Sequence, residues 1–164
     1  QKPFEAGNTH AFDAAAPCYG RNFPIRSHFE QASYFHSVLI DGYKYVGFLS
    51  LPTLELELPV MADWSEAKLK LSPCRYYGSV NGNDLVICAH NYARHFGRLT
   101  ELKSGDDVLF TDLDGNVTRY TVAELQVLGP DQVEDMTSGD YPLTLFTCTY
   151  GGKSRVTVRC DAVG

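Results

Sequence analysis

The amino-acid sequence predicts a mainly β protein, either a barrel or a sandwich, with about eight strands and only short helices between them. Two observations predict this class. Short runs of apolar and β-branched residues recur along the chain, and turn-forming clusters such as Asp114-Gly115-Asn116 separate them. The 164 residues are 44% hydrophobic, which is enough for one domain with a packed core, and no repeat or linker divides the chain further.

The first part of the chain has a different character. Residues 1–26 carry scattered Pro, Gly and Asn without a sustained period, so we expect a flexible N-terminal segment there and one folded domain over residues 27–164. Ser27 followed by Glu30 fits a capping box, which predicts an N-terminal helix over His28–Leu39.

Three strands and a helix are predicted between residues 45 and 80. Tyr45–Leu51 is a largely apolar run, and Thr53–Val60 alternates leucine with glutamate, as expected for a half-buried strand. Asp63–Leu71 is predicted to be a short helix with Asp63 as its N-cap, and Tyr76–Val80 a short strand.

The second half of the chain contributes the remaining elements. Phe96, Leu99 and Leu102 recur at helical spacing and predict a short helix that stops at Ser104-Gly105. Apolar runs bounded by turn residues predict five more strands, which are Asp84–Ala89, Val108–Asp112, Val117–Leu128, Pro142–Cys148 and Arg155–Cys160. A short turn joins the last two strands, so we expect them to run antiparallel and side by side.

Composition excludes several classes of function. The 14 Lys and Arg residues against 20 Asp and Glu give a formal charge of −6, so no nucleic-acid partner is expected. No run approaches the roughly 18 apolar residues of a membrane span. The five cysteines contain no Cys-x-x-Cys pair, so a common zinc site is not indicated. If one thiol is functional, the other four either form two disulfides, with three connectivities open, or remain buried thiols.

Three residues from separate strands are candidates for nucleophilic chemistry. Cys148 ends its predicted strand shortly before a Gly-Gly turn, where a thiol can be reached. His90 closes an apolar strand at the boundary between core and solvent, where an imidazole can keep a pKa of about 6.5. Arg155 begins the strand after the turn, close to the end of the Cys148 strand. On position alone a structural role is the simpler interpretation of Cys148 and of His90. For Arg155 the alternative is a solvated edge arginine, and for Arg159 we expect that solvated edge position.

Together these three side chains supply a mechanism. A free thiol with a pKa of about 8.5 is only slightly ionised at neutral pH. A nearby histidine can act as its base or, as imidazolium, hold the thiolate. An arginine fork can stabilise the oxyanion of a tetrahedral intermediate or orient the carbonyl groups of a substrate. Such a set would attack an amide carbonyl, form a thioacyl enzyme, and need a second nucleophile to release it.

The motifs around these residues resemble those of the sortases, the cysteine transpeptidases of Gram-positive bacterial surfaces. Thr144–Cys148 matches the family's Thr-Leu-x-Thr-Cys signature, Cys88–Asn91 matches its strand-terminal histidine motif, and Arg155 matches its essential arginine, in the same order along the chain. The segment from Gly47 to Val60 resembles the family's opening strands, and the whole resemblance covers about residues 45–161.

The resemblance implies a closed eight-stranded sortase-type β-barrel. It also implies site roles: nucleophile for Cys148, general acid and base for His90, oxyanion stabilisation or binding of the sorting signal for Arg155, and substrate contacts for Thr144, Thr147 and Asn91. The implied partners are an LPxTG-like sorting-signal peptide and an amine acceptor, from a peptidoglycan precursor or a pilin lysine. No cofactor is expected, with calcium left open. The implied location is the outer face of the cell membrane, with an anchoring N-terminal helix outside these 164 residues.

Two other functions stay open at this point. The chain could be a cysteine peptidase, in which water resolves the thioacyl intermediate, or an inactive β-barrel binding module in which Cys148 is structural. An L,D-transpeptidase is disfavoured, because its signature places histidine and cysteine within a few residues, whereas His90 and Cys148 belong to separate predicted strands.

Overall fold

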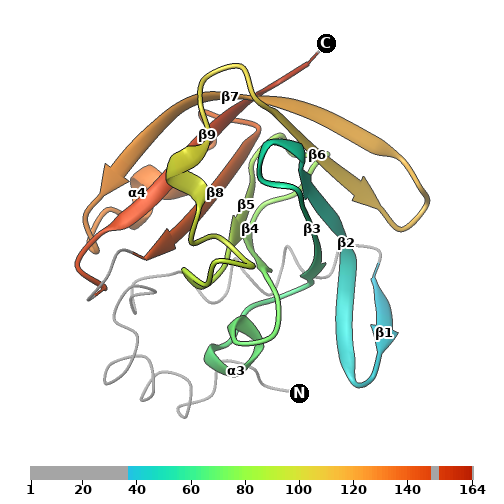
Figure 1. Cartoon of the computed structure of the whole chain (residues 1–164). Helices are drawn as coiled ribbons and strands as arrows, with labels where there is room; N and C mark the ends of the chain where they lie inside the picture. The colour runs from blue at the N-terminus through green and yellow to red at the C-terminus, as the bar shows by residue number, and fades with distance from the viewer. Residues whose placement is uncertain (1–36, 149–151, 164) are drawn as a thin grey trace.

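Eight strands close into a barrel in the computed structural model, which describes residues 37–148 and 152–163 (Figure 1). Around the barrel the strands follow the order β2-β3-β4-β5-β8-β9-β7-β6, and antiparallel pairing of β6 with β2 closes the ring. The β3–β4 and β5–β8 pairs are parallel. The mainly β class is therefore confirmed, as is the closed eight-stranded barrel that the resemblance implies, which decides between the barrel and the sandwich. Its strands are β2 (Tyr43–Leu51), β3 (Leu56–Met61), β4 (Cys74–Tyr77), β5 (Leu85–Cys88), β6 (Asp107–Asp112), β7 (Val117–Leu128), β8 (Leu143–Cys148) and β9 (Arg155–Ala162).

A short hairpin extends one end of this sheet. β1 (Val38–Ile40) pairs antiparallel with the start of β2 through Asp41 and Gly42, whose φ angles of 51° and 86° fit the turn that tight hairpins favour. The predicted helix His28–Leu39 is therefore wrong at its C-terminal end, because the turn folds Val38 and Leu39 back onto β2. The rest of that helix and the N-terminal segment 1–26 lie outside the described residues.

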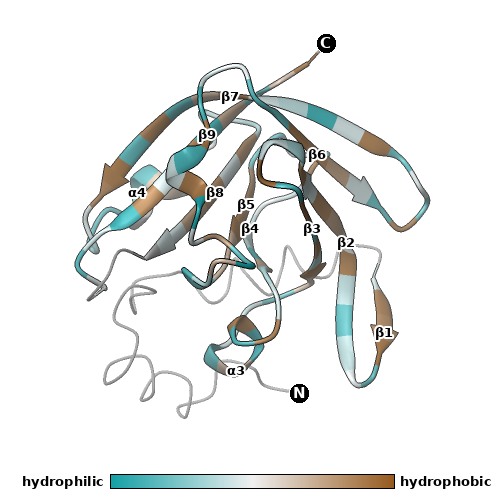
Figure 2. Ribbon diagram, in the orientation of Figure 1, coloured by the Kyte–Doolittle hydropathy of each residue, from teal (hydrophilic) through white to brown (hydrophobic). Residues whose placement is uncertain are grey.

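Packing divides the buried side chains into two groups, on the two sides of the strands. Hydrophobic and hydrophilic residues follow one another along the long strand β7 (Figure 2). The inner core fills the barrel and includes Leu49, Val60, Ile87, Leu145 and Val158. The outer cluster lies on the opposite face of β4, β5 and β8. Its members are Met61, Trp64, Leu69, Cys74, Tyr76, Val86, Cys88, Leu128, Met136 and Phe146. In a simple antiparallel barrel the outer face of the strands is solvated. Here part of that outer face is instead covered by the outer cluster.

The strand predicted over Thr53–Val60 begins later than expected. Pro52–Leu54 forms a 3₁₀ turn, η2, and Glu55 takes a left-handed conformation with φ of 58° before β3 starts. Proline pre-sets the φ angle of such a turn, and the turn buries Leu54 in the inner core. The alternation of leucine and glutamate is compatible with this turn as well as with a strand, because both conformations bury Leu54 and leave Glu55 exposed.

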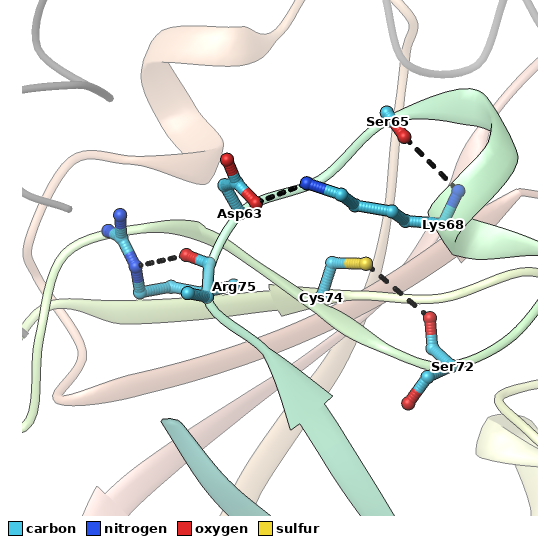
Figure 3. Close-up of polar contacts among 7 residues, drawn as sticks. Asp63, Ser65, Lys68, Ser72, Cys74 and Arg75 are labelled. Carbon is cyan, nitrogen blue, oxygen red and sulfur yellow. Dashed lines mark hydrogen bonds and ion pairs between the residues drawn. The ribbon is translucent and has the colours of Figure 1, made fainter. Parts of the chain in front are cut away.

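Among the described residues, two short α-helices lie outside the barrel, α3 (Glu66–Leu69) and α4 (Val133–Met136). The N-cap of α3 is Ser65, whose Oγ accepts a hydrogen bond of 3.1 Å from the Lys68 amide, and the predicted N-cap Asp63 is wrong. Asp63 instead pairs with the Lys68 ammonium group at 2.6 Å (Figure 3). In the described ranges no helix combines the length and apolar character that crossing a membrane requires.

The helix predicted around Phe96–Leu102 is reduced to a 3₁₀ turn, η3 (Leu99–Glu101). Phe96, Leu99 and Leu102 are all buried in the inner core, as their spacing indicated. The preceding residues instead form a closed loop, in which the Phe96 amide donates to the His90 carbonyl oxygen at 3.1 Å. This loop carries the candidate histidine, His90.

Candidate functional site

Strand register brings the three candidate residues to one rim of the barrel. β5 and β8 run parallel with Cys88 opposite Phe146, and the Ala89 amide continues the pairing by donating to the Phe146 carbonyl oxygen at 3.3 Å. His90 and Cys148 lie two residues beyond that pair and so reach the same level. β9 runs antiparallel to β8 with Arg155 opposite Cys148. The three residues therefore lie at neighbouring positions on adjacent strands.

His90 is held by a compact loop over residues 90–97. Its ring lies 5.0 Å from the Tyr92 ring, and Tyr92 lies 5.5 Å from His95. The Tyr92 carbonyl oxygen accepts from the amides of His95 and Gly97 at 2.9 and 2.8 Å. A Cβ at Gly97 would collide with the Asn91 carbonyl oxygen and lie 2.8 Å from that of Tyr92, so the loop requires glycine there.

The protonation of His90 follows from its surroundings. Burial lowers the pKa of its half-buried imidazole below the ordinary 6.5, and the positive charge of Lys70, in the segment after α3, lowers this pKa further. At neutral pH the ring is therefore mainly uncharged, with a lone pair available to accept a proton. This state suits a general base better than a pre-formed imidazolium partner for a thiolate.

Arg155 lies in a mostly covered position, with 5% of its surface exposed. Burial raises the pKa values of Tyr76 and Cys88, and the Arg155 guanidinium acts in the opposite direction on both, which places its charge close to the outer cluster. Tyr76 packs edge-on against Phe146 at 5.0 Å. A guanidinium in such a poorly hydrated setting interacts more strongly with a developing negative charge than one in open water.

The three predicted substrate-contacting residues occupy different positions. Thr147 precedes Cys148 and alternates with Phe146 of the outer cluster, so it projects to the inner face; it is 2% exposed, and its Oγ1 has no hydrogen-bond partner among the described residues. Thr144 is also buried and accepts a 3.0 Å hydrogen bond from Arg159. Asn91 is exposed beside His90. The substrate roles of all three stay predictions, with rim placement favouring Asn91 and Thr147 over Thr144.

Arg159 differs from its predicted solvated edge position. β9 pairs with β7 as well as β8, so it is an interior strand, and Arg159 is only 4% exposed. Its guanidinium lies 5.4 Å from the Tyr141 ring. It donates to four oxygens, which are Gln126 Oε1 at 2.9 Å, Thr144 Oγ1 at 3.0 Å, and the carbonyl oxygens of Asp135 at 2.6 Å and Met136 at 3.4 Å. Arg159 thereby fastens the C-terminal end of α4 to the barrel.

Replacing Arg159 by Lys is expected to lower the free energy of unfolding by about 2–3 kcal/mol, because one ammonium group cannot satisfy all four acceptors and some remain buried without a donor. Urea denaturation measures the change. The matched control is Arg94→Lys, at an exposed position, which should change stability by less than about 0.5 kcal/mol. Equal effects of the two substitutions would contradict a fastening role for Arg159.

The acidic side chains of the β6–β7 region stabilise turns by accepting hydrogen bonds from backbone amides. Asp112 accepts hydrogen bonds of 2.9 Å from the amides of Asp114 and Asn116, and Asp106 accepts one of 2.8 Å from the Lys103 amide. Within the part of the chain that the structure describes, no group of three or more His, Cys, Asp or Glu side chains could hold a metal ion.

Sequence reasoning missed the aromatic surroundings of the site. Tyr92, which lies against His90, was not identified from the sequence. Neither were Tyr76 and Trp64 of the outer cluster, whose rings are stacked 5.9 Å apart. Tyr92 follows His90 by two residues, which was an available local signal. Trp64 and Tyr76 come from other segments, and only folding brings them beside β5 and β8.

Comparisons with known proteins agree with this fold. The sortase domain family model matches residues 49–163. Sortase A of Bacillus anthracis is 27% identical over 135 residues, covering 76% of this chain, and the chain spans 63% of that relative's length. The crystal structure of sortase C1 from Streptococcus agalactiae matches with a TM-score of 0.70 and 25% identity, over 96% of this chain and 84% of that one. Sortase C of Streptococcus pneumoniae matches with a TM-score of 0.65 and 26% identity, over 73% and 67%.

Proposed function

The chain belongs to the sortase family, and from this premise we propose that it is a cysteine transpeptidase that cleaves an LPxTG-like sorting signal and transfers the acyl group to an amine. The observation that carries the proposal is the register of β5, β8 and β9, in which His90, Cys148 and Arg155 come to the same rim. Three residues from distant parts of the sequence, each suited to one part of acyl transfer, thus lie at neighbouring positions on adjacent strands, which supports the proposal.

The proposed reaction has two steps. The Cys148 sulfur attacks the carbonyl carbon of the scissile amide while neutral His90 takes the thiol proton, and Arg155 stabilises the oxyanion. Collapse of the tetrahedral intermediate breaks the C–N bond, and His90 returns the proton to the leaving amine. An acceptor amine then attacks the thioester, His90 takes one of its protons, and the thiol is regenerated as the new amide forms.

The partners follow from this chemistry. We propose a surface protein with a sorting signal as acyl donor, and an amine of a peptidoglycan precursor or a pilin lysine as acceptor. The Streptococcus pneumoniae relative is a sortase C studied for its pilin substrate specificity. The sortase family is associated with the surface of Gram-positive cells, and attachment of this chain to the outer face of the membrane is part of the proposal, as is assignment of residues 27–164 as the catalytic domain.

Product analysis tests the proposed function. The chain is incubated with a panel of LPxTG-type peptides, with and without an amine acceptor such as triglycine, and the products are identified by mass spectrometry. Transfer product that depends on the acceptor, together with an acyl adduct on Cys148, supports a transpeptidase. Hydrolysis alone identifies a peptidase. If neither product forms, and iodoacetamide labels Cys148 no faster than the other thiols, the chain is a binding module and the proposal fails.

The pKa of His90 leads to a pH prediction. In the proposed mechanism His90 acts as a base, and its pKa lies below 6.5. We therefore expect kcat to stay constant around neutral pH and to fall as the pH drops through the pKa of His90. Replacing Lys70 by Gln removes a positive charge that lowers this pKa, so the acid limb should move to higher pH. Proton NMR titration of His90 should show the same upward shift. The control Lys103→Gln, at another exposed position, should move neither. A downward shift with Lys70→Gln would contradict the assignment.

A further inference from the structure

Two buried cysteines face each other across β4 and β5. Cys74 and Cys88 are direct partners in the antiparallel register, and both side chains belong to the outer cluster, so they project from the same face of the sheet. Opposed residues of an antiparallel pair have Cα atoms about 4.5–5.5 Å apart. This separation lies within the range of about 4.4–6.8 Å that disulfides span.

The contacts of the two sulfur atoms are compatible with a bond between them. The Cys88 thiol donates to the carbonyl oxygen of Cys74 at 3.6 Å, so its sulfur already lies over the opposing residue. The Cys74 thiol donates to the Ser72 carbonyl oxygen at 3.5 Å (Figure 3). Thiols are weak donors, so either side chain loses little when it turns toward the other sulfur.

We propose that Cys74 and Cys88 are a disulfide-forming pair, oxidised when the chain folds in the presence of a small-molecule or protein disulfide. The two thiols lose two protons and two electrons as the S–S bond forms, and the external disulfide is reduced to two thiols. Both side chains are fully buried in the folded chain, so the bond forms while β4 and β5 pair and is then shielded from reductants. The extracytoplasmic setting of the sortase family is one in which such bonds persist.

The other described cysteines do not compete for this pairing. Cys160 lies opposite Leu143 on the inner face of β9, where it packs in the inner core. Cys148 belongs to the rim, on a strand separated from β4 by β5. The Cys74–Cys88 bond would close the β4–β5 connection two residues before His90, and so stiffen the strand that leads into the histidine loop. This inference is independent of the proposed transpeptidase activity.

Thiol mapping tests the pair. The chain is produced in an oxidising compartment as a Cys148→Ala variant, so that the candidate nucleophile does not form mixed disulfides, and is denatured with N-ethylmaleimide without reductant. We expect Cys74 and Cys88 to remain unlabelled and a linked peptide joining them to appear after proteolysis. Reduction should restore both labels. Full labelling of Cys74 and Cys88, or a linked peptide that joins either of them to Cys18 or Cys160, overturns the proposal.

A stability measurement supplies a second readout. The oxidised chain is expected to melt at a temperature roughly 5–10 °C above that of the reduced chain. The matched substitutions are Cys88→Ala and Cys160→Ala, both at fully buried positions. The difference in melting temperature between the oxidised and reduced chains should vanish in Cys88→Ala and persist in Cys160→Ala. If the Cys88 variant does not fold, the linked-peptide map of the parent chain still decides the question.

Discussion

Substitution of Cys148 by Ala is expected to remove both cleavage and transfer of a sorting-signal peptide, lowering kcat by roughly 10⁴-fold or more. No described thiol can replace it. Cys88 lies two residues deeper on the adjacent strand and is fully buried, and Cys160 faces the inside of the barrel. Because Cys148 ends its strand at the rim, the substitution should leave the unfolding midpoint nearly unchanged.

Cys160→Ala is the matched control for this prediction, because it also removes one thiol but from the inner core. It should leave kcat within about twofold and lower the free energy of unfolding by about 1–2 kcal/mol through loss of packing. Initial rates of peptide transfer and thermal unfolding of both variants give the comparison. Normal turnover in Cys148→Ala, or loss of turnover only in Cys160→Ala, would show that the nucleophile has been misassigned.

Replacement of Arg155 by Lys is expected to lower kcat by about 10²–10³-fold with a smaller change in KM. The guanidinium is held at 5% exposure beside the outer cluster, opposite Cys148. Its planar fork can direct two N–H groups at one oxyanion, whereas an ammonium group is a single, strongly hydrated charge whose burial is costly. The loss should therefore fall on the transition state rather than on binding alone.

Two measurements separate this catalytic effect from damage to the fold. Arg119→Lys changes an exposed arginine that pairs with Asp107 at 3.7 Å, and it should leave kcat unchanged. Added guanidinium ion should partly restore turnover to Arg155→Ala, because the ion can occupy the vacated position. Unimpaired kcat in Arg155→Lys would remove Arg155 from the mechanism.

Local patterns were sufficient for much of the barrel. β7 begins at Val117 and ends at Leu128, as predicted, because alternation, the Asp-Gly-Asn turn before it and the glycine after it all agree. Patterns failed where two conformations satisfy the same spacing. Leu54 is buried by a 3₁₀ turn rather than a strand, and Val38 pairs in a hairpin rather than continuing a helix.

Arg159 shows a different kind of failure. Strand alternation puts Arg155, Thr157 and Arg159 on one face of β9, but alternation does not tell whether this face is covered. The covering residues come from α4 and β7, and the four acceptors of the Arg159 guanidinium span residues 126–144. Burial of a charged side chain depends on such distant partners, which a local window does not contain.

The identities and order of His90, Cys148 and Arg155, the strand character around each, and the resemblance to sortases were all readable from the chain itself, because strand periodicity and turn chemistry are local properties. The tertiary structure alone decided that β5 lies beside β8, that the outer face of these strands is an aromatic cluster, and that Cys74 faces Cys88. Those facts depend on which strands pair and in which register, and pairing is set by the packing of the whole barrel.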